Sequence, residues 1–286
     1  MQSVYRNARS RLTVQQWCSD TLARAEFPLA TTTVDTAAGK VHLTSAGAGK
    51  PRIVVIPGTG HNAAAALPWL RALSACWPTT IVDLPGQPGL SDPRRPRRAR
   101  LAWYGRVLAE VLKTAQLDDV ILVGNSLGAA VALSAASPRI TARALVSPAG
   151  FVSLTVDPKL IRASMAWLLR PTIDHTRDML QLFVAPGRSA PESEVDWMTL
   201  MAANCRTTLA PPPLPAAVLA DRAQVPCLVA VGEHDRFLPP RRLAPVVQHT
   251  TNTRLRIIGS MGHLTTPEHL SDVVALVAEV AGPSSS

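Results

Sequence analysis

Ser126 lies in the segment G-N-S-L-G (residues 124–128), between an apolar run at 120–123 and a run of small residues at 129–133. The unbroken apolar run predicts a strand buried on both faces of a parallel sheet, and the run of small residues predicts a helix. Glycines on both sides of the serine permit a turn too sharp for larger side chains. Because this turn leads into a helix N-terminus, whose N–H groups favour negative charge, the pattern indicates a serine nucleophile.

This strand, turn and helix resemble the nucleophile elbow of the α/β-hydrolase family. The segment 232–240 resembles the family loop G-x-x-D-x-x-x-P, which carries the acid of a catalytic triad, and the resemblance places that acid at Asp235. His263 follows a predicted strand at 254–258, where the family has its catalytic histidine. The chain order Ser, Asp, His is also the order of this family. The resemblance therefore implies a triad of Ser126, Asp235 and His263.

These three residue types fit one reaction class. A serine hydroxyl is a weak nucleophile at neutral pH and needs a base such as imidazole to remove its proton. The imidazole needs a carboxylate to fix its tautomer and to favour its charged form. Glu233 is a nearby alternative for this carboxylate, but Asp235 holds the family position.

In the family, two backbone N–H groups bind the oxygen that becomes negative during acyl transfer. The resemblance assigns these donors to Thr59, in the loop after a predicted strand at 52–56, and to Leu127. This chain has Pro57 where the family usually has histidine. Because the donor is a backbone group, the departure leaves the predicted oxyanion hole in place.

We therefore predict an α/β protein with the α/β-hydrolase fold: a mostly parallel central sheet of about eight strands, flanked by helices and carrying a helical cap insertion. Apolar or β-rich runs predict strands at 31–35, 40–44, 52–56, 79–83, 120–123, 143–147, 225–231 and 254–258. Helices are predicted at 14–25, 63–73, 101–115 and 267–280. The segment 83–91 resembles the family loop D-x-P-G-x-G-x-S, with Gln87 and Pro88 departing from the commoner pair, and supports the fold rather than the chemistry.

The strand pattern stops between residues 153 and 223. This stretch predicts helices at 159–169, 172–184 and 193–205, followed by a break at three consecutive prolines, and it resembles the cap of lidded α/β-hydrolases. The predicted organisation is a helical lead-in at 1–30, a core domain at 31–152 and 224–282, a cap at 153–223 and a tail at 283–286.

The formal net charge is +9, and five arginines fall between residues 94 and 100. Because prolines interrupt this run and no aromatic residue accompanies it, we interpret it as a solvated loop and predict no nucleic-acid partner. No segment predicts a membrane span, and the N-terminus lacks the apolar region of a secretory signal. The four cysteines have no metal or redox spacing, which indicates reduced thiols in a cytoplasmic protein. No metal or organic cofactor is implied.

The predicted function is hydrolysis of an ester-type bond, in a carboxylester, thioester or lactone, by a serine hydrolase. The expected partner is a small, largely apolar substrate, and the basic loop near the entrance would instead favour an anionic one. Phe151 follows a predicted strand and is a candidate wall of the substrate pocket. His61 and Asn62, just after Thr59, are interpreted as ordinary polar loop residues.

Two other functions fit the same fold. The dipeptide Asn125-Ser126 resembles the elbow of capped hydrolases that cleave carbon–carbon bonds in ring-fission products, although Leu264 stands where those enzymes usually carry tryptophan. Related capped proteins are cofactor-free lyases, cyclases or haloperoxidases. A non-catalytic binding protein is the third possibility, and the presence of all three triad residues counts against it.

Overall fold

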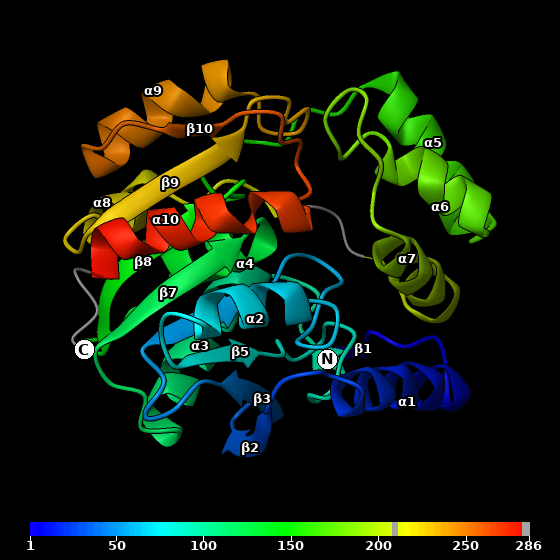
Figure 1. Cartoon of the computed structure of the whole chain (residues 1–286), viewed down its shortest axis with the longest axis horizontal. Helices are drawn as coiled ribbons and strands as arrows, with labels where there is room; N and C mark the ends of the chain where they lie inside the picture. The colour runs from blue at the N-terminus through cyan, green and yellow to red at the C-terminus, as the bar shows by residue number, and fades with distance from the viewer. Residues whose placement is uncertain (208–210, 282–286) are drawn as a thin grey trace.

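A single sheet organises the molecule in the computed structural model, which describes residues 1–207 and 211–281. Within these residues, eight strands lie in the order β10-β9-β8-β7-β4-β5-β3-β2 (Figure 1). From β10 to β5 in this order, neighbouring strands are parallel, whereas β3 is antiparallel to both β5 and β2. The strands are β2 (Ala30–Thr36), β3 (Gly39–Ala46), β4 (Ile53–Ile56), β5 (Thr79–Val82), β7 (Val120–Asn125), β8 (Ile140–Val146), β9 (Cys227–Gly232) and β10 (Arg256–Ile258). The predicted fold class and the mostly parallel sheet are confirmed.

Helices cover both faces of this sheet. The helices are α1 (Ala8–Ala23), α2 (Leu67–Ser74), α3 (Arg100–Thr114), α4 (Leu127–Ser134), α5 (Pro158–Leu169), α6 (Ile173–Leu180), α7 (Glu192–Asn204), α8 (Ala216–Arg222), α9 (Pro240–Thr251) and α10 (Leu270–Ala281). Apolar residues of α2 and α10 form one core layer with the sheet, and those of α3, α4, α8 and α9 form the other. Two short strands, β1 (Gln2–Ser3) and β6 (Arg94–Arg95), pair with each other outside the main sheet.

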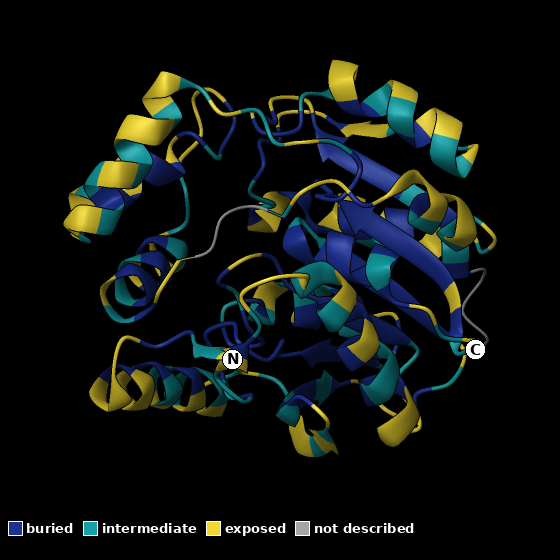
Figure 2. Cartoon of the chain, turned by 180° about the vertical axis from the view of Figure 1, so that it is seen from behind, coloured by how far each residue is buried: buried dark blue, intermediate teal, exposed yellow. Residues whose placement is uncertain are grey.

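Strand β4 shows why the central strands are apolar throughout. Ile53 and Val55 pack in the layer of α2 and α10, whereas Val54 and Ile56 pack in the layer of α3 and α4. All four residues are buried because successive side chains of a strand point to opposite faces. Figure 2 shows the same buried character along the central strands.

Helices α5, α6 and α7 lie together beyond the end of the sheet to which the arrowheads of β7 and β9 point (Figure 1). Their bounds agree closely with the prediction except for α6, which ends at Leu180 rather than at 184. The chain then turns, and the carbonyl of Phe183 accepts a hydrogen bond from the N–H of Leu264 at 2.8 Å. This bond joins the end of α6 to the loop after β10.

Helix α8 was not predicted, and it lies inside the range 153–223 assigned to the cap. It packs against α4 and α9, and Leu219 belongs to the core layer of those helices. No pattern in the sequence predicted this helix, because it is only seven residues long and follows a proline-rich segment. The predicted tail at 283–286 lies outside the described residues.

The N-terminal helix begins earlier than the predicted range 14–25. Asn7 caps α1 by accepting a hydrogen bond from the N–H of Ser10 at 2.8 Å, so that the helix begins at Ala8. Helix α1 lies against α7, with the rings of Trp17 and Trp197 centred 4.4 Å apart. Among the described residues, no helix combines the length and the apolar character that crossing a membrane requires.

The junction of β7 and α4 is tightly packed, and it yields a stability prediction. A Cβ atom on Gly128 would lie 1.9 Å from the carbonyl oxygen of Ile56. Gly128→Ala should therefore lower the free energy of unfolding by about 2 kcal/mol, measured by urea denaturation. Gly259→Ala is the matched control, because a Cβ atom there meets nothing nearer than 3.9 Å. Equal stability of the two variants would contradict this account.

Candidate active site

Ser126 occupies a strained turn between β7 and α4. Its backbone has φ 49° and ψ −112°, a conformation that residues other than glycine rarely adopt. The two flanking glycines make room for this turn. A Cβ atom on Gly124 would lie 2.5 Å from Cα of Ala129, and Gly128 abuts β4 as described above. The strain is a sign of function, because the surrounding structure must hold a conformation that the serine itself disfavours.

The structure brings the three predicted catalytic residues into one hydrogen-bonded row. The Ser126 Oγ atom lies 3.0 Å from Nε2 of His263, and Nδ1 of the same ring lies 2.8 Å from Oδ2 of Asp235. The three side chains come from loops after β7, β9 and β10, whose carboxyl ends meet at one edge of the sheet. With Nδ1–H donating to the carboxylate, Nε2 presents its lone pair to the serine hydroxyl.

Asp235 is built to remain charged although only 2% of its surface is exposed. Its Oδ1 atom accepts hydrogen bonds from the N–H groups of Phe237 and Leu238, both at 2.9 Å. Burial by itself would raise the pKa of Asp235, but the imidazole of His263 and the N–H of Leu238 help to hold the pKa below its ordinary value. A carboxylate held charged in this way can stabilise an imidazolium.

Two aromatic rings fix the position of the His263 ring. The ring of Phe237 is centred 4.8 Å from the imidazole, and that of Phe183 is centred 6.0 Å away in an edge-on arrangement. His263 is consequently 9% exposed. The sequence did not assign these positioning roles, because Phe183 lies in the predicted cap and reaches the histidine only through the turn that follows α6.

The predicted oxyanion donors lie beside the serine. Leu127 is the first residue of α4, so its N–H group has no acceptor within the helix. Thr59 belongs to the loop after β4, and the adjacent Gly58 passes close to the serine: a Cβ atom on Gly58 would lie 3.6 Å from Cβ of Ser126. Thr59 and Leu127 also line one cavity of about 340 Å³.

A polar network from the core holds the loop that carries Thr59. The N–H of Gly60 donates to Oε1 of Gln87 at 3.0 Å, and Nε2 of Gln87 donates to the hydroxyl of Tyr104 at 2.9 Å. Gln87 is one of the two residues at which the loop 83–91 departs from the family pattern. At this position, the glutamine thus links the loop that carries Thr59 to Tyr104 in the core.

Helix α7 holds the same loop from another side. Nε1 of Trp197 donates to the carbonyl of Gly60 at 3.0 Å, and Nε2 of His61 lies 2.8 Å from Oε1 of Glu194. Nδ1 of His61 lies 3.0 Å from the carbonyl oxygen of Thr59. Burial alone would lower the pKa of His61, but the Glu194 carboxylate and the Thr59 carbonyl raise it to about 8. His61 is therefore part of the site rather than an ordinary loop residue.

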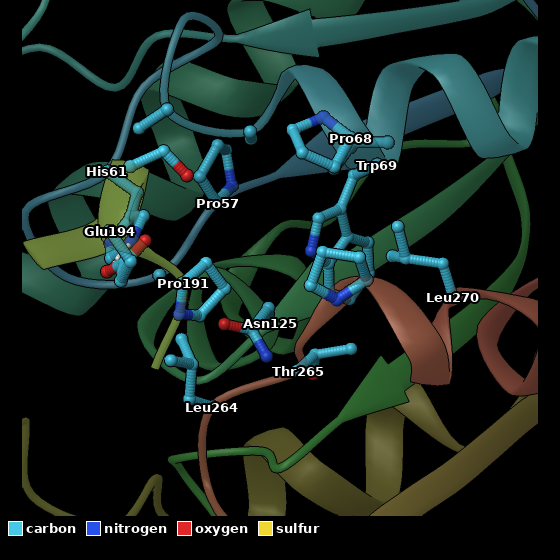
Figure 3. Close-up of a pocket in the computed structure, with 16 residues that line it drawn as sticks. Pro57, His61, Pro68, Trp69, Asn125, Pro191, Glu194, Leu264, Thr265 and Leu270 are labelled. Atoms are coloured by element: carbon cyan, nitrogen blue, oxygen red, sulfur yellow. Dashed lines mark hydrogen bonds and ion pairs between the residues drawn. The ribbon is translucent and has the colours of Figure 1, made fainter. Parts of the chain in front are cut away.

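The residues on either side of Ser126 line two cavities. Asn125 lines a cavity of about 90 Å³ together with His61, Glu194 and Leu264 (Figure 3). Leu127 lines the larger cavity of about 340 Å³ already described. The two residues that flank the serine thus face different cavities.

The larger cavity is mostly apolar but carries positive charge. Its walls include Leu101, Tyr104 and the segment 211–215, and Arg97 and Arg100 also line it. Neither arginine forms an ion pair with a carboxylate within the described part of the chain.

The other members of the basic run have different surroundings. Arg95 is buried and donates to the carbonyls of Gly86 and Arg206, so the interpretation of the whole run as a solvated loop was wrong for this residue.

Phe151 is buried in the core layer of α3 and α4 and lines neither of the two cavities. Its role in substrate binding stays a prediction.

The ion pair of His61 and Glu194 predicts a specific dependence of stability on pH. A pKa raised from about 6.5 to about 8 contributes about 2 kcal/mol below pH 6.5, and this contribution is lost as the pH rises through 8. Urea denaturation should show that the stability of the wild type falls by this amount more than that of Glu194→Gln between pH 6 and pH 9. Glu192→Gln, which removes an exposed ion pair on the same helix, should behave as the wild type. Identical pH dependence in all three proteins would refute the assignment.

Comparisons with known proteins agree with this fold. Residues 53–279 match the model of the alpha/beta hydrolase family. A 2-hydroxy-6-oxononadienedioate/2-hydroxy-6-oxononatrienedioate hydrolase of Cupriavidus pinatubonensis is 26% identical over 267 residues, which cover 85% of this chain and 91% of that protein.

Two solved structures are similar in fold. Carboxylesterase CesB of Bacillus subtilis has a TM-score of 0.80 at 19% identity, over 96% of this chain and 99% of that chain. The 2-hydroxy-6-oxo-6-phenylhexa-2,4-dienoate hydrolase of a Rhodococcus strain has a TM-score of 0.67 at 20% identity, over 89% and 99% of the two chains. The family match covers most of the chain, so this protein belongs to the alpha/beta hydrolase family and is an enzyme of the hydrolase class.

Proposed function

We propose that this protein is a serine hydrolase that cleaves an ester-type bond of a small, largely apolar substrate. The observation that carries the proposal is the row of Ser126, His263 and Asp235, with atoms 3.0 Å and 2.8 Å apart. Such a row has the geometry required for a nucleophile, its base and the group that orients the base.

The reaction would proceed in two steps. The Ser126 oxygen attacks the substrate carbonyl while Nε2 of His263 accepts the hydroxyl proton, and the resulting imidazolium is stabilised by Asp235. As the tetrahedral intermediate collapses, the imidazolium gives its proton to the leaving alcohol or thiol, and an acyl-serine remains. A water molecule then attacks the acyl-serine with the same histidine as base, and the acid and the free serine are released.

The oxyanion of each tetrahedral intermediate would be bound by the N–H groups of Thr59 and Leu127. Each such donor stabilises the transition state by about 3 kcal/mol in enzymes of this kind. The N-terminus of α4 adds a favourable field because Leu127 is its first residue. The backbone donors explain why Pro57 is compatible with the chemistry.

The organisation of the chain fits this function. We propose that the segment 153–223 contains a cap formed by α5, α6 and α7, which covers the site, while α8 belongs to the core. The substrate would extend from the serine into the cavities lined by Asn125 and by Leu127. The four cysteines are unpaired and three of them are buried, which supports a cytoplasmic location as part of this proposal.

A second function is favoured by a separate observation. The curated relative named above is a hydrolase of a dioate, a dicarboxylate, and Arg97 and Arg100 line the cavity that also contains the proposed oxyanion donors. Within residues 1–207 and 211–281, these two guanidinium groups form no ion pair with a carboxylate, so they are suited to hold a substrate carboxylate. Cleavage of a carbon–carbon bond in a dienol-ketone acid is therefore the alternative, and Leu264, in place of the usual tryptophan, counts against it.

The nucleophile is tested with a fluorophosphonate probe, which labels activated serines. The wild type should be labelled at Ser126 and should hydrolyse p-nitrophenyl esters, because His263 activates the hydroxyl. Ser126→Ala should lose labelling and lower kcat by about 10⁴-fold or more while its thermal unfolding stays unchanged. A wild type that resists the probe and hydrolyses no ester would leave the binding-protein hypothesis as the better one. Full activity in Ser126→Ala would exclude Ser126 as the nucleophile.

The substrate class is tested by comparing p-nitrophenyl esters, with and without a terminal carboxylate, with a dienol-ketone acid. The double variant Arg97→Gln/Arg100→Gln should lower kcat/KM for the acidic substrates by about 10-fold or more, because each lost charge-assisted hydrogen bond is worth about 1.5 kcal/mol. Neutral esters should react as with the wild type. An equal effect on neutral and acidic substrates would exclude these arginines as carboxylate ligands.

A further inference from the structure

In the loop that carries Thr59, the backbone carbonyls of residues 58, 59 and 60 each have a hydrogen-bond partner. The carbonyl of Gly58, in the same peptide plane as the Thr59 N–H, accepts a hydrogen bond from the N–H of His61 at 3.1 Å. The carbonyl of Thr59 lies 3.0 Å from Nδ1 of the His61 ring. Gly60 is held at its N–H by Gln87 and at its carbonyl by Trp197. The direction of the Thr59 N–H is therefore set by these partners.

Helix α7 supplies two of these restraints. Trp197 bonds the loop directly, and Glu194 acts through the His61 ring at 2.8 Å. These two residues lie three positions apart and hence on one side of the helix. Figure 3 shows His61 and Glu194 meeting at one end of the cavity that also contains Pro57 and Asn125.

The N-terminal segment holds α7 in turn. Trp17 of α1 packs on Trp197, and the N–H of Arg206, just after α7, donates to the carbonyl of Val4 at 2.7 Å. The hydroxyl of Tyr5 donates to the carbonyl of Gly89 in the core at 2.8 Å. Helix α7 is thus fixed relative to the core independently of the His61–Glu194 pair, so it can serve as a support for the loop.

We infer that Glu194 and Trp197 of α7 are positioning residues for the oxyanion hole, and that the cap thereby sets the geometry of the Thr59 N–H donor. This inference rests on the proposed function, since it concerns the same reaction. Glu194 and Trp197 need not touch the reacting atoms, because they act through His61 and through the Gly60 carbonyl. A part of the catalytic rate is therefore controlled from the cap.

The charge on His61 decides whether both ring contacts are favourable. The imidazolium donates from Nε2 to Glu194 and from Nδ1 to the Thr59 carbonyl at once. The neutral ring has only one N–H, so one of its lone pairs must face either the carboxylate or the carbonyl. Among the residues that line this cavity, only His61 and Glu194 have titratable side chains, from the loop and from α7 respectively.

This arrangement predicts that kcat falls at alkaline pH. As His61 loses its proton above pH 8, its remaining N–H stays on the stronger acceptor, which is the Glu194 carboxylate. The Thr59 carbonyl then loses its donor, the loop shifts and kcat should fall. A glutamine at position 194 can turn its amide to donate to a neutral ring, which leaves Nδ1–H on the Thr59 carbonyl. Glu194→Gln should therefore retain neutral-pH activity and lose the alkaline fall.

The experiment measures kcat and KM on a neutral p-nitrophenyl ester from pH 6.5 to pH 9. Glu194→Ala removes both the charge and the acceptor and should lower kcat about 10-fold at all pH values, less than the 10²–10³-fold loss for a missing donor, with KM within about twofold. Trp197→Phe keeps an aromatic ring next to Trp17 and removes the Nε1 donor together with the smaller ring of the indole, so kcat should fall several-fold. Glu192→Gln is the control and should match the wild type.

Each result has one consequence. Wild-type kcat in Glu194→Ala, or an unchanged alkaline limb in Glu194→Gln, overturns the inference while leaving the hydrolase proposal intact. If Glu194→Ala does not fold, the pH profile of Glu194→Gln decides alone. A wild type that neither turns over esters nor reacts with fluorophosphonate refutes the proposed function itself, and with it the inference that rests on it.

Discussion

The close approach of the elbow to strand β4 is the constraint on which the rest of the site depends. Only a glycine at 128 lets the start of α4 approach the carbonyl of Ile56 at the observed distance. That contact places the N-terminus of α4 beside the loop after β4. In our proposal, the N–H groups of Leu127 and of Thr59 therefore act on one oxygen atom. The strained backbone of Ser126 is a consequence, and the packing of two layers of helices on a fully buried sheet stabilises it.

Besides packing, charged groups contribute to the arrangement of the site. A carboxylate as buried as Asp235 would be neutral in an apolar site, but the imidazole and two backbone N–H groups keep it charged. Its charge and that of the Glu194–His61 pair serve different purposes. In our proposals, the first prepares a base for the serine proton, and the second holds a loop that carries an N–H donor.

In our proposals, the cap has a structural role besides covering the site. Helix α7 contacts the loop of Thr59 on one side and the N-terminal helix on the other, and the turn after α6 reaches the loop of His263. Any movement of α7 away from the core would disturb the loop that carries Thr59, because Glu194 and Trp197 bond to that loop. Binding of a substrate under the cap and completion of the oxyanion hole would then be one event.

The sequence by itself determined the fold and the candidate triad, because each depends on local patterns. The glycines around Ser126, the apolar runs of the strands and the loops of Asp235 and His263 are features of a few consecutive residues, and parallel strands necessarily bring their carboxyl ends together. Only the tertiary structure decided which residues support the triad and the loop that carries Thr59. Glu194 meets His61 across 133 positions of the chain, and Phe183 reaches His263 only because α6 ends before its predicted limit. Likewise, Arg95 is buried whereas Arg97 lines a cavity, although both belong to one basic run. Such contacts depend on how separate elements pack, and no spacing along the chain encodes them.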